Sequence, residues 1–384
     1  MKIADRVTDL PPYVFAKVEK RIAEQRARGV DVINLGIGSP DLAPPRFITD
    51  TMYQSALRED THGYAGYYGT PALRKAIADY YQRRFGVEVN PNGEVLPLIG
   101  SKEGLANMAL AFIDPGDYAL ASDPGYPTYR MGALMAGGDF YPMPLSEETD
   151  WLVDFEEIPA DIAVKSPIMW LNYPNNPTGA GAPIEFLKRA VDFAREYDIV
   201  ICYDNPYCDL TFDGYVAPSI LEMPGAKDVA VEFNSLSKTY NMAGWRVGMA
   251  VGNAQAIEAL TTVKTNIDSG IFRPLQDAAT AALTGDQSWL AERNLIYQKR
   301  RDIIMGWLPQ VGMTARPPKG TLYVWAKAPA GVKCDAFALE ALERTGVWIT
   351  PGTAFGDHGD GYFRISLCVP EDRLIEAGER LSRL

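Results

Sequence analysis

The sequence predicts an α/β protein in which a mostly parallel sheet lies between helices and a smaller α+β part follows. Short apolar, β-branched runs alternate with stretches of helical periodicity along most of the chain, a pattern typical of parallel sheets with helices on both faces. With 384 residues, 47% of them hydrophobic, the chain is long enough to bury two cores. After a long helical stretch over residues 253–307 the elements become shorter and mixed. We therefore expect two domains.

The charge and hydropathy of the chain count against two kinds of partner. The formal net charge is −12, whereas binding a nucleic acid requires a basic face. The sequence contains no run of about 18 apolar residues, which a membrane-spanning helix would need, and its first residues do not form a secretory signal. We expect a cytoplasmic protein with no nucleic-acid and no membrane partner.

The cysteines and histidines count against disulfide and metal chemistry. Four cysteines without C-x-x-C spacing, in a chain of this length, favour reduced thiols; they are Cys202, Cys208, Cys334 and Cys368. The only histidines, His62 and His358, lie far apart in sequence. A zinc site built on histidines is therefore not expected, and a Ser-His-Asp hydrolase would have to use one of these two residues. We predict no metal.

The first elements of the chain are a helix and a strand that ends in glycines. Residues 13–28 show helical periodicity. Residues 32–38 form an expected strand that ends in Gly36 and Gly38. A dinucleotide-binding fingerprint would need a third glycine and an immediate helix, which the proline-rich segment 39–45 cannot begin. The sequence thus disfavours a nicotinamide oxidoreductase.

The next elements predict an anion-binding turn. Residues 64–69 form an aromatic, glycine-rich loop, which suggests a binding or subunit contact. A helix is expected over residues 70–86, with a threonine cap, proline at its first position and a glycine stop. The expected strand 94–99 then runs through small residues at 100–104 into an apolar helix over 105–113. Such a turn binds anions readily because the first backbone N–H groups of a helix have no partners.

Several strands are each followed by polar or aromatic side chains. Further strands are expected over residues 118–122, 168–171, 199–203 and 228–233, and a helix over 184–197. The side chains that come just after strands are Ser101, Tyr126, Asn176, Asp204, Ser235 and Lys238, and Tyr207 follows Asp204 by three residues. In sheets of this kind ligands bind beyond the carboxyl ends of the strands, so one crevice can collect all of them.

Lys238 suggests a chemistry for that crevice. A lone lysine in this position is usually a solvated loop residue, but an amine here can also form a Schiff base with a carbonyl cofactor. Ser235 and Arg246 can then hold the phosphate of that cofactor. If the cofactor is pyridoxal 5′-phosphate, its pyridine nitrogen needs an anion to stay protonated, and Asp204 supplies one.

The remaining residues of the crevice fit the same cofactor. Asn176 and Tyr207 can donate hydrogen bonds to its ring oxygen, and the turn at Ser101-Lys102 can bind its phosphate. Tyr126 can lie against its ring. Arg364 lies inside a strand-like apolar run over residues 361–367. An arginine there pairs either with a carboxylate of the protein or with the α-carboxylate of a substrate.

The order and spacing of these motifs can be matched to a family. The motifs are residues 175–179, Asp204 with Tyr207 three residues on, Ser235-x-Ser237-Lys238 with Arg246 eight residues on, and Arg364. They closely resemble the class I/II aminotransferases, the aspartate-aminotransferase-like fold type I of pyridoxal-phosphate enzymes, over nearly the whole chain. The resemblance implies a large domain over residues 46–285 with a mostly parallel seven-stranded sheet. It implies a small domain made of residues 1–45 and 286–384.

The resemblance also implies an assembly and a reaction. Tyr64 should reach the phosphate of the cofactor in a partner subunit, which implies a homodimer with shared active sites. Gly38 should lie beside the substrate carboxylate. The implied reaction is a transamination in two half-reactions, from an amino acid to a 2-oxo acid such as 2-oxoglutarate. In it the amine of Lys238 moves the proton at the substrate α-carbon.

The amino acid substrate is less clear from the sequence. Residues 100–104, 264–270 and 351–359 resemble the LL-diaminopimelate aminotransferase group. That group is expected to have an acidic side chain in the 64–69 loop, where this chain has tyrosines, so alanine, aspartate or an aromatic amino acid remain alternatives. Lys102 and Glu103 are candidates for binding a distal charge.

Two further alternatives concern the reaction and Arg273. A β-lyase of the same fold would keep every cofactor residue, so the motifs do not separate it from an aminotransferase. A regulator of this fold normally has an added DNA-binding domain, which the acidic chain does not favour. Arg273 either forms a salt bridge or contacts a second substrate carboxylate.

Overall fold

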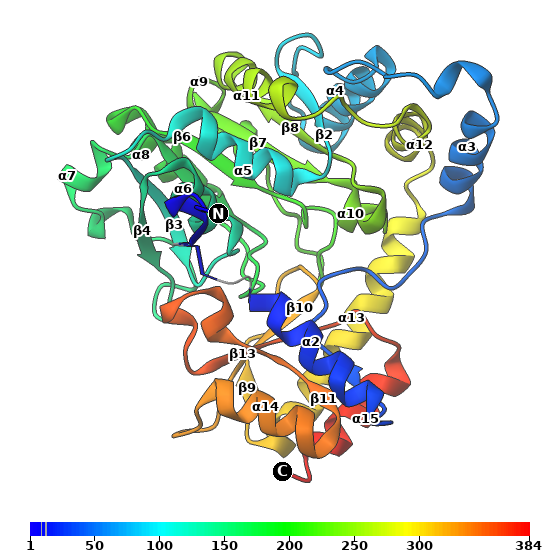
Figure 1. The fold of residues 1–384 in the computed structure, drawn as a ribbon, viewed down its shortest axis with the longest axis vertical. Helices are drawn as coiled ribbons and strands as arrows, with labels where there is room; N and C mark the ends of the chain where they lie inside the picture. Colours follow the sequence, from blue (N-terminus) through cyan, green and yellow to red (C-terminus); the bar gives the residue numbers. More distant parts are fainter. Residues whose placement is uncertain (9, 12–13) are drawn as a thin grey trace.

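The computed structural model describes all residues from 1 to 384 except 9, 12 and 13 (Figure 1). It has an upper part built on a large sheet and a lower part with two small sheets, and the long helix α13 (Trp289–Trp307) runs between them. The expected start of the first long helix at residue 13 lies outside the described residues. The helix itself, α2, covers Val14–Ala27.

The large sheet has seven strands in the order β2-β8-β7-β6-β5-β3-β4. The strands are β2 (Val95–Leu98), β3 (Tyr118–Asp123), β4 (Asp139–Pro144), β5 (Ile168–Asn172), β6 (Val200–Asp204), β7 (Ala230–Ser235) and β8 (Gly248–Gly252). Only β8 runs antiparallel to its neighbours β2 and β7, and the other pairs are parallel. The prediction of a mostly parallel seven-stranded sheet is therefore confirmed, although β4 and β8 were not among the expected strands.

The sheet is covered by helices on both faces because its strands are apolar on both faces. Along β5, Met169 and Leu171 belong to one hydrophobic cluster, whereas Ile168 and Trp170 belong to another on the opposite face. Three helices cover the first face: α4 (Pro71–Phe85), α8 (Ile184–Tyr197) and α12 (Arg273–Thr284). Three cover the second: α5 (Ser101–Phe112), α6 (Thr128–Ala136) and α11 (Ala254–Ile267).

The lower part has a hydrophobic cluster of its own. Its sheets have the orders β12-β13-β10-β9 and β1-β11. The strands are β1 (Ile33–Asn34), β9 (Thr314–Ala315), β10 (Tyr323–Lys327), β11 (Val347–Trp348), β12 (Thr350–Pro351) and β13 (Tyr362–Ser366), with helices α14 (Cys334–Thr345) and α15 (Glu371–Leu381) beside them. The β1–β11 pair joins the N-terminal segment to the C-terminal part. The predicted domain boundaries themselves stay a prediction.

Several element bounds differ from the expected ones. The expected strand over 32–38 is reduced to the two residues of β1, because the glycines that follow lie in the cavity described below. Residues 228 and 229 end the short helix α9 (Ala226–Val229), and the strand begins only at Ala230. The helical stretch over 253–307 consists of α11, α12 and α13, separated by short loops.

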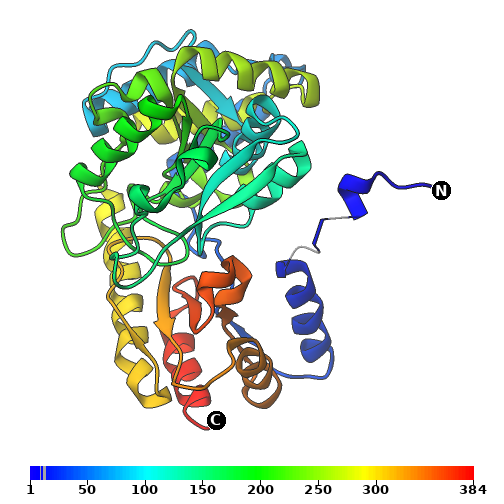
Figure 2. The same ribbon diagram turned by 90° about the vertical axis from the view of Figure 1, so that its left-hand side faces the viewer.

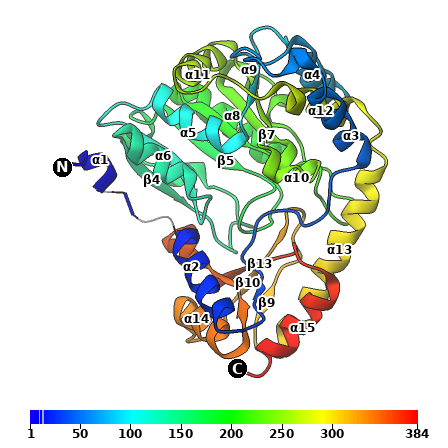
Figure 3. The same cartoon turned by 45° about the vertical axis from the view of Figure 1, so that its right-hand side comes forward.

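The remaining helices are short or peripheral. They are α1 (Asp5–Thr8), α3 (Arg46–Ala56), α7 (Ala160–Ala163) and α10 (Leu236–Thr239). Figure 2 shows α1 standing away from the lower part, and Figure 3 shows it on the side of α6. None of the helices in the described part of the chain has both the length and the apolar character that crossing a membrane requires.

Gly248, the first residue of β8, permits a close backbone approach. A Cβ atom there would lie 2.6 Å from the amide nitrogen of Ser101 and 2.9 Å from the carbonyl carbon of Gly100. These are backbone atoms, which cannot move aside as a flexible side chain can. Because Gly248 has no side chain, the start of β8 can lie directly against the N-terminus of α5.

The substitution Gly248→Ala should therefore lower the free energy of unfolding by about 1–3 kcal/mol, the usual cost of overpacking a core. Urea unfolding followed by circular dichroism measures this change. The matched control is Gly306→Ala on α13, where an added Cβ meets nothing within 4 Å. That variant should be neutral or more stable by roughly 0.5–1 kcal/mol. Equal effects of the two substitutions would contradict the steric argument.

Candidate active site

A single cavity of about 390 Å³ lies at the carboxyl ends of the parallel strands. All but one of the site residues predicted from the sequence line it: Gly38, Ser101, Lys102, Tyr126, Asn176, Asp204, Tyr207, Ser235, Lys238, Arg246 and Arg364. Tyr64 does not line the cavity, and its side chain is 93% exposed. The structure thus brings together residues that lie more than 300 positions apart in sequence.

Lys238 lies in α10, the single helical turn that follows β7. Ser235 caps this turn, since its Oγ accepts a hydrogen bond from the backbone N–H of Ser237 at 3.2 Å. The Nζ of Lys238 donates to the carbonyl oxygen of Gly38. The buried Arg293 of α13 donates to the carbonyl oxygens of Lys238, at 2.9 Å, and Asp209, at 2.7 Å. The backbone that holds the lysine is therefore fixed on both sides.

An anion-binding pocket lies at one end of the cavity. It combines the N-terminus of the 12-residue helix α5 with the side chains of Ser101, Ser235 and Arg246. Gly100 precedes the helix with a φ of +77°, and a Cβ there would overlap the guanidinium of Arg246. Free helix N–H groups, hydroxyls and an arginine are the donors that a phosphate group needs.

Asp204 is a buried carboxylate in which only one of the two oxygens has a hydrogen-bond partner among the described residues. Its side chain is 5% exposed, and its Oδ2 accepts a hydrogen bond from the hydroxyl of Tyr129 at 2.7 Å. Its Oδ1 is buried and has no hydrogen-bond partner among the described residues. Burial raises the pKa of Asp204 to about 7, although the hydroxyl of Tyr129 and the charge of Lys238 act in the opposite direction.

The unpartnered Oδ1 suits a cationic N–H group in the cavity. A protonated pyridine nitrogen would supply both the missing hydrogen bond and the opposite charge. The anion pocket and the lysine lie in the same cavity. The donor set of the site therefore fits pyridoxal 5′-phosphate.

Tyr207 and Asn176 offer donors on another wall of the cavity. Burial raises the pKa of Tyr207 well above its ordinary value, so this residue stays a neutral phenol. Its hydroxyl lies 3.3 Å from that of Tyr323. The backbone N–H of Asn176 donates to Asn172 Oδ1 at 2.6 Å, and Asn172 Nδ2 donates to the carbonyl oxygen of Asp204 at 2.6 Å. Asn172 thus fixes the loop of Asn176 against the end of β6.

Arg364 presents a guanidinium held in one orientation. It donates to Oδ1 of Asn176 at 3.0 Å and to the carbonyl oxygen of Gly36 at 2.9 Å. Its carbon Cζ lies 4.0 Å from the ring centre of Tyr323 and 4.6 Å from that of Phe355. A planar cation stacked between two rings is preorganised to bind a carboxylate.

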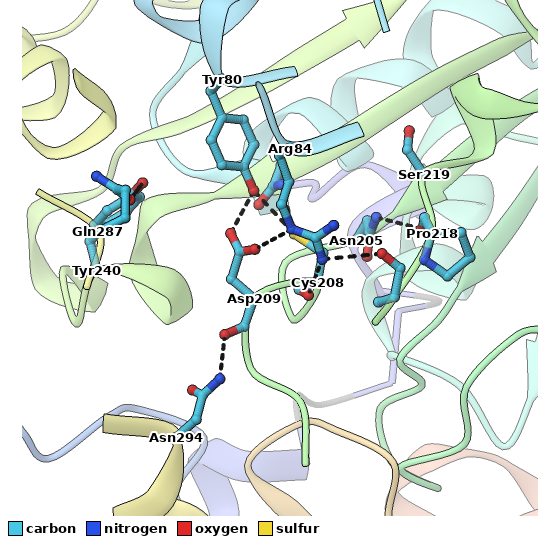
Figure 4. A network of polar contacts seen from close by, with 12 residues as sticks. Tyr80, Arg84, Asn205, Cys208, Asp209, Pro218, Ser219, Tyr240, Gln287 and Asn294 are labelled. Atoms are coloured by element: carbon cyan, nitrogen blue, oxygen red, sulfur yellow. Dashed lines mark hydrogen bonds and ion pairs between the residues drawn. The ribbon is translucent and has the colours of Figure 1, made fainter. Parts of the chain in front are cut away.

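The segment after β6 is anchored from outside the cavity through Asp209 (Figure 4). The carboxylate of Asp209 accepts hydrogen bonds from the hydroxyl of Tyr80 at 2.6 Å and from Nε of Arg84 at 2.7 Å. Its backbone carbonyl oxygen accepts from Nδ2 of Asn294 at 3.0 Å. Asp204 and Tyr207 are therefore tied through this segment to α4 and to α13.

Two residues considered for substrate recognition have other partners. Glu103 lies outside the cavity lining and accepts hydrogen bonds from the backbone N–H of Ile99 at 2.7 Å and from Nδ2 of Asn107 at 3.1 Å. It also pairs with the buried Lys264 at 3.3 Å. Arg273 pairs with Asp277 at 2.9 Å. Both side chains take part in salt bridges of the protein itself.

A lysine, a buried aspartate and an anion pocket at the carboxyl ends of a mostly parallel sheet define a pyridoxal-phosphate-dependent enzyme of fold type I. The family "Aminotransferase class I and II" matches residues 30–381. A curated relative from Moorella thermoacetica, an LL-diaminopimelate aminotransferase, is 50% identical over 384 residues, which cover all of this chain and 98% of the relative. The chain belongs to the class I and II aminotransferases, and it is a pyridoxal-phosphate-dependent enzyme.

Solved structures agree with this assignment. The substrate-bound BacF structure from Bacillus subtilis aligns with a TM-score of 0.97 at 38% identity, over 100% of this chain and 98% of that one. An aspartate aminotransferase mutant from Thermus thermophilus aligns with a TM-score of 0.93 at 29% identity, over 100% and 99%. The expected fold and reaction class are therefore confirmed, while the roles of individual residues stay predictions.

Some residues of the site were not found from the sequence. Tyr129, Asn172, Tyr323 and Trp348 all contact or line the site. Tyr129 lies in α6, three residues after Tyr126, which precedes the helix, and the two rings pack edge to face with centroids 5.8 Å apart. Tyr323 and Trp348 lie in apolar strands, where their sequence looks like core. Asn172 looks like an ordinary strand end.

The cofactor-free protein should lose stability as the pH rises from about 4 to above 7. Since the pKa of Asp204 is raised in the folded state, its contribution is fully present below its unfolded pKa and is lost as the pH passes through the folded value of about 7. The substitution Asp204→Asn should remove a drop on the order of a few kcal/mol. Unfolding free energies of both proteins between pH 5 and 8 measure this.

Two comparisons separate the titration of Asp204 from the titration of other buried groups. Glu232 is also buried, and burial raises its pKa to about 7, so a smaller slope should remain in Asp204→Asn and fall further in a double variant with Glu232→Gln. Adding the cofactor to the unchanged protein should flatten the slope, because Asp204 then has a cationic partner. If the unfolding free energy depended on pH equally in the unchanged protein and in Asp204→Asn, Asp204 would not be the group that titrates.

Proposed function

We propose that this aminotransferase uses LL-diaminopimelate as its amino donor and 2-oxoglutarate as its acceptor. The observation that carries the proposal is full-length similarity to relatives named LL-diaminopimelate aminotransferase, at 50% identity for Moorella thermoacetica. The cavity supports it, because its wall contains charged groups of both signs beyond those that the reaction centre needs.

The bound cofactor supplies an aldehyde that condenses with amines and a ring that takes up an electron pair from the substrate carbon. The chain supplies the groups around it. The pocket of Ser101, Ser235 and Arg246 would bind the phosphate, and Asp204 would hold the pyridine nitrogen in its protonated form. Tyr126 would lie against the ring.

Lys238 acts as the proton carrier of the proposed reaction. Its amine is held near Gly38, and this glycine would lie beside the substrate carboxylate bound by Arg364. The amine would move the proton between the α-carbon of a substrate held there and the cofactor. The neutral hydroxyl of Tyr207 and the amide of Asn176 would donate to the ring oxygen and keep the ring in place.

We also propose that the enzyme is a homodimer with shared active sites and that it works in the cytoplasm. Tyr64 and Tyr68 are 93% and 58% exposed, and Phe272 nearby in the fold is 44% exposed. Gly270 lies against the backbone of Gly66, so the 64–69 loop and the segment before α12 form one surface. Exposed aromatic side chains of this kind favour a protein contact. The four cysteines are free thiols, as expected in a reducing compartment.

A half-reaction panel tests the substrate. The pyridoxal-phosphate form of the enzyme is mixed with single amino acids, and loss of the cofactor's absorbance is followed in the absence of any 2-oxo acid. We expect a fast response to LL-diaminopimelate and slower responses to alanine, aspartate and phenylalanine. The variant Lys238→Ala should give no proton transfer and no turnover, because the proposed proton carrier is removed.

The panel also separates the alternatives. A strong response to alanine, aspartate or an aromatic amino acid, together with no response to LL-diaminopimelate, would show that LL-diaminopimelate is not the amino donor. Release of pyruvate and ammonia from cysteine-type substrates, without dependence on a 2-oxo acid, would indicate a β-lyase instead.

The dimer is tested by sedimentation and by Tyr64→Phe. Sedimentation should give a species of twice the 42.3 kDa chain mass. Tyr64→Phe should keep that mass but weaken cofactor retention about 10-fold or more, because one hydrogen bond to the partner's phosphate is lost. Tyr53→Phe, on an exposed tyrosine of α3, is the control and should retain the cofactor normally. A monomer with full activity would refute the shared sites.

A further inference from the structure

Only two carboxylates, Asp204 and Glu19, are found among the described residues that line the cavity. Asp204 is buried at the end of β6, and its unpartnered oxygen would bind the pyridine nitrogen in the proposed function. Glu19 comes from α2, an element that the catalytic proposal does not use. Its carboxylate is therefore available to a different part of the substrate.

The placement of Glu19 follows from the face that α2 turns inward. Ile22 is 4% exposed and belongs to the hydrophobic cluster of the lower part, and Val18 packs against the same cluster. Residues three or four apart share one side of a helix, so Glu19 lies beside Ile22, although its own side chain is exposed. Val18, Glu19 and Ile22 all line the cavity.

The carboxylate of Glu19 has no polar partner in the part of the chain that the structure describes. It makes no hydrogen bond or ion pair with any other residue that the structure describes, although Lys20 and Arg21 are its neighbours in sequence. Most acidic side chains on exposed helix faces are simply solvated. Glu24, one to two turns further along α2, is such a case and lies in a groove against α14, away from the cavity.

We propose that Glu19 binds the distal ammonium group of the substrate and so selects amino acids with a second amine. The inference rests on the proposed function, which supplies a substrate with two amino groups. The 64–69 loop, where an acidic side chain was expected for this purpose, contains only Tyr, Ala and Gly. Glu19, on α2 in the lining of the cavity, is the carboxylate that would provide this charge instead.

Substrate pairs that differ only in the distal amine test the role. LL-diaminopimelate is compared with L-2-aminopimelate, which has the same chain and both carboxylates but one amine. In Glu19→Gln, kcat/KM for LL-diaminopimelate should fall about 10- to 100-fold, the effect of losing a charged hydrogen bond. The value for L-2-aminopimelate should stay unchanged, and Glu19→Lys should enlarge the difference.

Two controls isolate binding from turnover and from general damage. Glu24→Gln should leave both substrates unaffected. In the Lys238→Ala background, which cannot turn over, the dissociation constant of LL-diaminopimelate should rise by a similar factor when Glu19 is changed to Gln. Equal losses for both members of the pair, or no loss for either, would overturn the proposal.

A second pair of substrates tells a wrong substrate proposal apart from a wrong role for Glu19. If the unchanged enzyme ignores LL-diaminopimelate, the proposed function fails, and L-lysine is compared with L-norleucine instead. A preference for L-lysine that disappears in Glu19→Gln would still support the role of Glu19. Absence of any preference for a distal amine in the unchanged enzyme would refute it.

Discussion

The buried carboxylate of Asp204 is the constraint around which the active site is arranged. A charge removed from water is costly unless it is paired and hydrogen-bonded. The protein satisfies one oxygen through Tyr129, whose own ring stacks on Trp170 with centroids 5.9 Å apart. The other oxygen has no hydrogen-bond partner among the described residues. In the proposed function it would pair with the protonated ring nitrogen, which would couple cofactor binding to the charge state of Asp204.

The two parts of the molecule meet at the backbone of the candidate site residues. Arg293 on α13 donates to the carbonyl oxygens of Lys238 and Asp209, and Arg364 on β13 donates to Asn176, in the loop after β5. A rotation of the lower part relative to the sheet would therefore act on Lys238 and on Arg364 together. Positioning of the reacting groups depends on the contact between the parts as much as on the sheet.

The sequence predicts those features that depend on residues close together along the chain. Strands were visible as apolar runs, and the polar residue after each strand end could be assigned to one crevice because parallel strands share an edge. The prediction failed for β4, with two prolines, and for β8, with two glycines and a small residue, because these strands depend on neighbours for their pairing. Their positions are set by contacts across the sheet rather than by propensity.

The sequence by itself determined the fold class, the cofactor and the reaction, since these depend on residue types that recur at fixed distances after strand ends. Tertiary structure alone decided the partners of ambiguous charges. Glu103, a candidate for substrate binding, pairs with Lys264 161 positions away, whereas Glu19, unremarkable on a surface helix, lines the cavity. The physical reason is that the role of a charged side chain depends on the groups that contact it in the folded chain. A local sequence pattern does not show a partner so distant along the chain.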